Sequence, residues 1–155
     1  VYHPLAVYSS YFSIRAKAFD LRIMTGDLGV QMREFNRIKA LDRAASPKDK
    51  DLMSALEVSM EMYKSGYRFI NVDIQHSCAR RFSIKDGALL PPFLAIDSLG
   101  EKVADAIVEE REEKPFTSLK DMQRRCKISN TIIEIMKELK CCGDLPEDEQ
   151  MSLFG

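Results

Sequence analysis

The bend Asp97-Ser98-Leu99-Gly100 is the segment of this sequence best suited to bind a ligand through its backbone. A short apolar turn leads into the bend, and the apolar spacing after it predicts a helix from Glu101 to Glu112. A bend of this kind directs successive backbone N–H groups to one point at the helix N-terminus. Such a point attracts a phosphate oxygen without reading base sequence. Ser98, Leu99 and Gly100 are therefore candidate phosphate-binding residues.

The segment around this bend has the form of a helix-hairpin-helix motif. The usual pattern has glycine at both positions of the bend, whereas here Ser98 replaces the first glycine and only Gly100 remains. Because a single glycine bend is a weak signal, a plain corner between two helices is the alternative interpretation.

A basic stretch follows the bend. Between Pro115 and Lys140, six basic residues accompany three acidic ones, which gives a net charge of 6 − 3 = +3 in 26 residues. The basic residues that we expect to contact DNA are Lys120, Arg124, Arg125 and Lys127. Because the whole chain carries a formal charge of −1, this local excess is typical of a surface that meets phosphate groups. A solvated helix face is the alternative interpretation.

The C-terminal segment combines acidic residues with a short apolar end. Four acidic residues lie between Asp144 and Glu149, and the residues that follow are Gln150, Met151, Ser152, Leu153 and Phe154. Large apolar side chains on an unstructured acidic tail gain nothing from exposure, so they favour insertion into a pocket of a partner protein. A hydrophobic end without function is the alternative interpretation.

No self-contained active site is predicted. The sequence contains neither G-x-x-x-x-G-K-[ST] nor G-x-G-x-x-G, and its only histidines are His3 and His76. The acidic residues lie on predicted helix faces and form no strand-borne pair that would hold Mg²⁺. The four cysteines lack the spacing of a structural zinc site, so we expect reduced, partly buried thiols. We predict no catalytic residue, metal site or cofactor in this chain.

The composition is that of a folded globular protein. The chain has 155 residues, of which 45% are hydrophobic and 30% charged, and this argues against collagen-like, disordered and disulfide-scaffold classes. No run of about 18 apolar residues exists and no signal peptide precedes the first helix, so we expect no membrane span and a cytoplasmic, nucleoid-associated location. The missing initiator methionine suggests a piece of a longer protein.

The elements that must position these residues are mainly helical. The hydrophobic spacing and the capping residues predict helices over 4–15 and 26–41, and another that begins at Pro47 and runs for about 18 residues. A small β element is expected over 67–90, with Asp86-Gly87 as its turn. Three further helices are expected over 101–112, 117–124 and 129–140. The predicted fold class is mainly α with a small β element.

Several segments together suggest a family. They are Tyr2-His3-Pro4-Leu5-Ala6, Tyr11-Phe12-Ser13-Ile14-Arg15, Ala45-Ser46-Pro47-Lys48, Asp73 with Ser77 and Ala79, Leu90-Pro91-Pro92-Phe93, Ala95-Ile96, Leu99-Gly100 and the closing Gln150 to Phe154. With these segments the whole chain resembles the C-terminal end of the replicative DNA polymerase III alpha subunit of the Gram-positive type, PolC. The closing residues resemble the pentapeptide by which bacterial polymerases bind the sliding clamp, with Met151 where leucine is usual.

The resemblance implies three parts. Residues 1–66 correspond to the helical end of the fingers domain, residues 67–145 to a duplex-DNA-binding domain with the helix-hairpin-helix, and residues 146–155 to a flexible clamp-binding tail. The partners implied are primer-template duplex DNA, the sliding clamp (beta subunit) and the polymerase domains upstream. The parent enzyme would be a DNA-directed DNA polymerase, a nucleotidyltransferase whose palm domain uses Mg²⁺ outside this chain. The chain alone is then expected to be inactive.

Two other interpretations remain at this point. A non-enzymatic helix-hairpin-helix adaptor would bind DNA and the clamp with the same bend and tail. A purely structural helical domain would have no role on nucleic acid. DNA binding that weakens steeply with salt separates the first two interpretations from the third.

Overall fold

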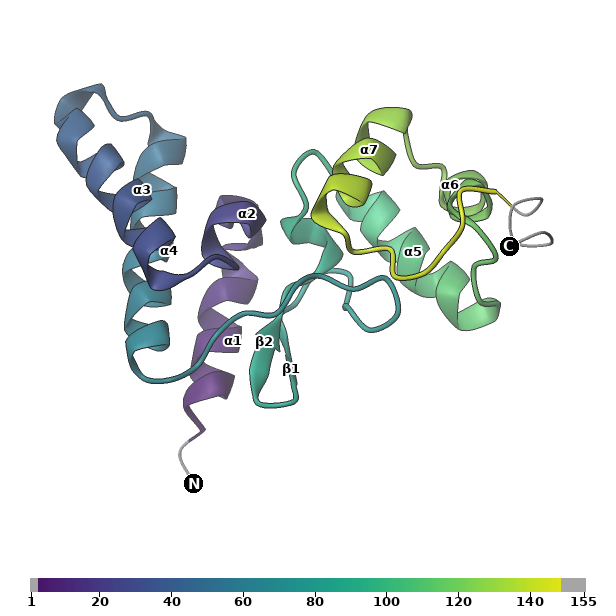
Figure 1. Cartoon of the computed structure of the whole chain (residues 1–155), viewed down its shortest axis with the longest axis horizontal. Helices are drawn as coiled ribbons and strands as arrows, with labels where there is room; N and C mark the ends of the chain where they lie inside the picture. Colours follow the sequence, from purple (N-terminus) through teal and green to yellow (C-terminus); the bar gives the residue numbers. More distant parts are fainter. Residues whose placement is uncertain (1–2, 149–155) are drawn as a thin grey trace.

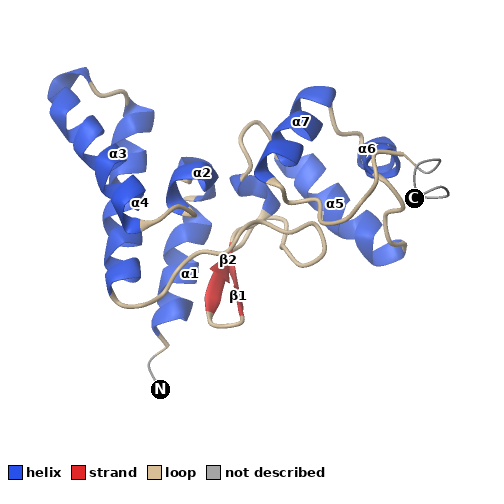
Figure 2. Ribbon diagram, viewed as in Figure 1, coloured by secondary structure: helices blue, strands red, loops and turns tan. Residues whose placement is uncertain are grey.

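The computed structural model of the chain describes residues 3–148. In this range the chain forms seven α-helices, three short 3-10 helices and one two-stranded sheet (Figures 1 and 2). The α-helices are α1 (Pro4–Ile14), α2 (Leu21–Met24), α3 (Leu28–Leu41), α4 (Pro47–Lys64), α5 (Glu101–Glu113), α6 (Leu119–Cys126) and α7 (Asn130–Leu139). The other elements are η1 (Ala16–Ala18), η2 (Asp42–Ala44), η3 (Phe93–Ala95), β1 (Ser83–Lys85) and β2 (Ala88–Leu90). The predicted fold class, mainly α with a small β element, is confirmed.

The first helices form one end of the molecule. Helices α3 and α4 pack against each other as an antiparallel pair, and α1 lies between this pair and the sheet (Figure 1). Helix α4 begins at the predicted cap, where the Ser46 hydroxyl accepts from the Asp49 N–H and the Asp49 carboxylate accepts from the Ser46 N–H. The short helix α2 was not expected from the sequence. The carboxylate of Asp20 caps it by accepting two backbone N–H groups.

The sheet is smaller than the predicted β element. Strands β1 and β2 pair antiparallel with Ile84 opposite Leu89, and the turn between them is the predicted Asp86-Gly87, where both residues have positive φ. The segment 69–74, expected as a strand, contributes only an isolated bridge between Phe69 and Leu89. After it, the backbone turns on itself, because Asp73 and Ser77 bond to each other and draw the chain away from a ladder.

The core runs continuously from the N-terminal helices into the rest of the chain. Four phenylalanine rings meet at its centre. They are Phe12 of α1, Phe19 after η1, Phe69 of the isolated bridge and Phe82 before β1. The rings of Phe12 and Phe69 stand edge to face with centroids 4.9 Å apart, an arrangement that aromatic pairs favour. Helix α4 ends at Lys64, close to the predicted boundary between 66 and 67, but the core does not divide there. That boundary stays a prediction.

Helices α5, α6 and α7 form the other end of the molecule (Figure 2). Helix α6 begins two residues later than predicted, because Ser118 caps it by accepting from the Asp121 N–H at 2.9 Å. Ser129 caps α7 as the sequence suggests. Helix α5 packs on α6, and the buried side chains of α7 complete this part of the core.

Candidate nucleic-acid interface

The first hairpin connects η3 to α5 and has an open helix N-terminus. Ser98 has a left-handed backbone with φ of 67°, Leu99 is fully buried, and Gly100 is the N-cap residue of α5. The N–H groups of residues 100–103 have no acceptor within residues 3–148, and no side chain caps the helix. A β carbon placed on Gly100 would meet no atom within 4 Å. The backbone therefore offers several unpaired donors, in open space, at the positive end of a helix.

A second hairpin with the same pattern connects α6 to α7. Lys127 has a left-handed backbone with φ of 56°, Ile128 is buried, and Ser129 is the N-cap residue. The three residues thus repeat the pattern of Ser98, Leu99 and Gly100: a left-handed residue, a buried aliphatic residue and an extended N-cap residue. The sequence points to Lys127 by its charge and to Ser129 as a helix cap, but the hairpin that they form with Ile128 was not predicted. The signal was present, because Lys-Ile-Ser and Ser-Leu-Gly each place a branched aliphatic residue one position before the N-cap of an amphipathic helix.

The predicted basic residues differ in their exposure and in their ion-pair partners. Lys127 is exposed and its ammonium group has no partner within the described range. Lys120 lies 3.5 Å from the Asp148 carboxylate, and Arg124 lies 2.8 Å from the carboxylate of Asp121; both basic side chains are largely exposed. These three cations remain within reach of solvent. The set is therefore suited to meet a polyanion, with Lys127 the least restricted.

Arg125 is the exception in that set. Its side chain is only 15% exposed, and its guanidinium donates to the carbonyls of Glu110 and Lys114 and to the carboxylate of Asp121 at 2.6, 2.8 and 3.1 Å. The same group lies over the ring of Phe116. Arg125 therefore joins the end of α5 to α6. Its role as a DNA contact stays a prediction, but its visible role is to hold these two helices together.

Hydrogen bonds and nearby opposite charges stabilise the ionised forms of Asp121 and Arg125. Burial alone would raise the pKa of Asp121, but hydrogen bonds from the Thr117 N–H and from Arg125 outweigh it, so the pKa is lowered. Burial alone would lower the pKa of Arg125, but its bonds to Asp121 and Glu110 outweigh it, so the pKa is raised. Both groups are therefore ionised at neutral pH.

The start of the predicted tail is held against the folded part. The carbonyls of Pro146 and Glu147 accept from the N–H groups of Leu119 and Lys120 at the N-terminus of α6, and the Glu147 carboxylate lies 2.8 Å from the Lys137 ammonium. Residues 146–148 therefore differ from the free tail expected from the sequence, because they cap a helix whose first N–H groups need acceptors. The predicted clamp-binding residues Gln150, Met151, Ser152, Leu153 and Phe154 lie outside the described residues.

Three further findings concern metal ligands, membrane-spanning helices and the cysteines. Within residues 3–148, no three His, Cys, Asp or Glu side chains come together in a way that could hold a metal ion. Over the same range, no helix is both long enough and apolar enough to cross a membrane. The four cysteines are free, and burial raises the pKa of the Cys126 thiol to about 11. That thiol is therefore protonated at neutral pH.

Comparison with known proteins agrees with this geometry. Residues 66–151 match the family model described as "Helix-hairpin-helix motif", and the chain belongs to this family. The matched range contains both hairpins.

Two curated relatives are both DNA polymerases of one type. The chain is 43% identical, over 99% of its length, to "DNA polymerase III PolC-type" of Caldanaerobacter subterraneus subsp. tengcongensis. It is also 43% identical, over 99% of its length, to the protein of the same name from Streptococcus pyogenes serotype M12. The chain spans only 11% of the length of each of these curated relatives. It is therefore similar to a segment of a PolC-type DNA polymerase III.

Proposed function

We propose that the chain is the part of a PolC-type replicative polymerase that binds duplex DNA without sequence preference. The open N-terminus of α5 at Gly100 is the observation that carries this proposal. Backbone N–H groups and a helix dipole contact phosphate oxygens, which are the same at every base pair. The second hairpin adds an exposed lysine in the same conformation, and membership of the helix-hairpin-helix family supports a backbone-directed contact.

A pair of substitutions at Gly100 tests this proposal. Aspartate and asparagine have nearly the same shape, both cap helices well, and the site has room for either side chain. Gly100→Asp places a negative charge where a phosphate would bind, whereas Gly100→Asn does not. We expect Gly100→Asp to bind duplex DNA at least about tenfold more weakly than Gly100→Asn, because like charges repel at the contact.

The measurement is fluorescence anisotropy on two duplexes of equal length and unrelated sequence. Both duplexes should bind with the same affinity, and the affinity should fall steeply with salt concentration. The thermal midpoints of both variants should equal or exceed that of the original chain, because each side chain caps α5. Equal DNA affinities for the aspartate and asparagine variants would remove the first hairpin from the interface.

Catalysis belongs, in this proposal, to parts of the polymerase outside the chain. The palm domain of the parent would hold Mg²⁺ and transfer nucleotides with two metal ions. Purified chain, supplied with Mg²⁺, nucleotides and a primed template, should therefore extend no primer. Template-dependent extension would contradict this part of the proposal.

We further propose that residues 150–154 bind the sliding clamp. The residues are Gln150, Met151, Ser152, Leu153 and Phe154, and their resemblance to a clamp-binding pentapeptide supports the assignment. Burying Leu153 and Phe154 in a pocket would contribute about 1.5–3 kcal/mol each, and a short peptide of this kind reaches roughly micromolar affinity. Replacing both residues by alanine should abolish clamp binding and leave the thermal midpoint unchanged. Retained binding would assign the clamp contact to another segment.

A further inference from the structure

Lys17 reaches the first hairpin from the N-terminal part of the chain. Its ammonium group donates to the carbonyl oxygen of Leu99 at 2.6 Å, across 82 positions in sequence. Lys17 lies in η1, and the burial of Ala16 and Phe19 on either side fixes that turn against η3. The packing of the core therefore fixes the backbone position from which the exposed Lys17 side chain reaches the Leu99 carbonyl.

The bond acts on the peptide group that begins the phosphate-binding site. The carbonyl of Leu99 and the N–H of Gly100 belong to one planar peptide unit, and in a trans peptide these two groups point in opposite directions. When Lys17 holds the carbonyl on one side, the Gly100 N–H is directed to the other. A positive charge on the carbonyl also draws electron density from the nitrogen and strengthens the N–H as a donor.

The acidic residues around the hairpin give an added cation a physical role, beside Arg80 and the exposed Lys102 of α5. The exposed acidic residues Asp97 and Glu101 flank the bend on both sides, and two carboxylates oppose the approach of a phosphate. Arg80 lies 3.6 Å from the Glu101 carboxylate and offsets that charge. Unlike the second hairpin, which carries Lys127, the first hairpin has no cation at its left-handed position, because Ser98 stands there. Lys17 supplies a positive charge from outside the hairpin.

We propose that Lys17 is a positioning residue of the first hairpin: it orients and polarises the Leu99–Gly100 peptide so that the Gly100 N–H is ready for a phosphate oxygen. This inference rests on the proposed function. Lys17 lies outside the range 66–151 matched by the helix-hairpin-helix family. The N-terminal part of the chain would then raise the affinity of the first hairpin for duplex DNA.

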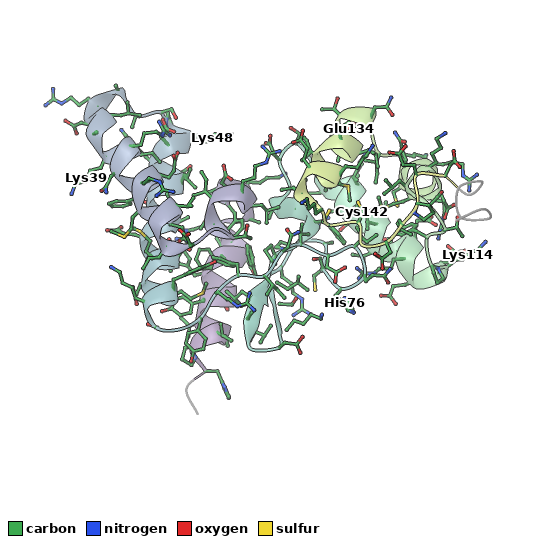
Figure 3. The ribbon with its side chains drawn as sticks, viewed as in Figure 1. Lys39, Lys48, His76, Lys114, Glu134 and Cys142 are labelled. Carbon is green, nitrogen blue, oxygen red and sulfur yellow. The ribbon has the colours of Figure 1, made fainter. Side chains whose placement is uncertain are left out.

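Three variants test the inference. Lys17→Met removes both the charge and the bond, Lys17→Arg retains a cationic donor, and Lys48→Met is the matched control. Lys48, which is labelled in Figure 3, lines the same pocket as Lys17 and Ser98, but its ammonium has no acceptor within the described part of the chain. The control therefore removes the same charge from the same region without touching the hairpin.

Two measurements on each variant separate positioning from other roles. The first is the ¹⁵N–¹H chemical shift of the Gly100 amide without DNA, which should move in Lys17→Met and return toward its original value in Lys17→Arg. The second is duplex affinity over a range of salt concentrations. We expect Lys17→Met to weaken binding roughly five- to tenfold, the scale of one ordinary hydrogen bond, because Lys17 acts on DNA only through the Gly100 N–H. Lys17→Arg should restore most of the affinity. Lys48→Met should change both readouts much less.

The slope of log affinity against log salt concentration gives the final distinction. A positioning residue touches no phosphate, so Lys17→Met should lower affinity without altering the slope. A slope flattened by about 0.9, the value for one lost phosphate contact, would overturn the inference in favour of a direct contact. An unmoved Gly100 amide would overturn it as well. The amide shift is measured without DNA, so it tests the effect of Lys17 on the hairpin even if the chain does not bind DNA. The duplex affinity of the original chain tests the proposed DNA binding separately.

Discussion

Ser98 holds a left-handed backbone conformation with φ of 67°, at the position where glycine is usual in a hairpin of this kind. A residue with a β carbon is strained there, by about 1–2 kcal/mol. We expect Ser98→Gly to stabilise the chain by about 1 kcal/mol, because relief of strain exceeds the added entropy of glycine in the unfolded chain. Ser98→Ala retains the β carbon and should give no such gain. Urea unfolding of both variants measures the difference, and equal stabilities would show that Ser98 is unstrained.

Asp121 links stability to pH. Its pKa is lowered, because hydrogen bonds from Thr117 and Arg125 outweigh the effect of burial. A carboxyl group with a pKa below the unfolded value of about 3.9 contributes its full stability above that value. The contribution is lost as pH falls through the folded pKa. Asp121→Asn should cost about 2 kcal/mol at neutral pH, since Arg125 loses a charged partner.

Urea unfolding at a series of pH values, from neutral down to strongly acidic, measures this linkage. The difference in unfolding free energy between the original chain and Asp121→Asn should shrink below about pH 4, where the carboxyl group of the original chain begins to protonate. A difference that stays constant over the whole series would show that Asp121 does not titrate with folding.

Among the elements, the segment 146–148 pairs with lysines of the basic stretch that the proposed DNA contact would use. Glu147 pairs with Lys137 at 2.8 Å and Asp148 with Lys120 at 3.5 Å, so two ammonium groups of the basic stretch already have carboxylate partners. Glu147→Gln with Asp148→Asn removes both of these carboxylates, although Lys137 keeps the Glu134 carboxylate at 3.5 Å. The carbonyl caps on α6 stay intact. We expect tighter duplex binding and a salt slope steeper by up to about 0.9 for each lysine that gains a phosphate.

The matched control for this prediction is Glu57→Gln with Glu61→Gln. These residues are exposed on α4, far along the chain from the basic stretch, and their replacement makes the same change in net charge. If both double variants tighten binding equally, the effect is one of overall charge and the segment 146–148 does not compete with DNA.

Elements with a strong local signal were predictable, and those that depend on distant contacts were not. Helix α4 was predicted because Ser46, Pro47 and Asp49 form a start that needs no tertiary information. The segment 69–74 was assigned to a strand on its β-branched residues, but the bond between Asp73 and Ser77 turns the backbone away. The family was recognised from its motifs. The internal bonds of Arg125 were not predictable, because its acceptors come from another helix and from the loop between them.

At the scale of the whole molecule, the aromatic cluster decides whether the chain behaves as one unit or two. The cluster joins Phe12 and Phe19 of the N-terminal part to Phe69 and Phe82 beyond the predicted boundary at residue 66. Rings stacked edge to face contribute beyond their buried area, and truncating one in a core costs about 3–5 kcal/mol. The Ser9 and Ser13 hydroxyls also bond to the backbone of Phe82. Neither part can lose this interface without exposing the centre of the core.

We therefore expect the chain to unfold in a single cooperative transition. The sequence provides a convenient test: it contains no tryptophan, and all five tyrosines lie within the first 67 residues. Tyrosine fluorescence thus reports on the N-terminal part, whereas far-ultraviolet circular dichroism reports on helices throughout the chain. The two signals should change at the same urea concentration, because a shared core makes the parts unfold together. Phe82→Ala should lower that midpoint for both signals equally, although the substitution lies outside the tyrosine-bearing part. A tyrosine transition displaced from the dichroism transition would mean that the N-terminal helices form an independent unit.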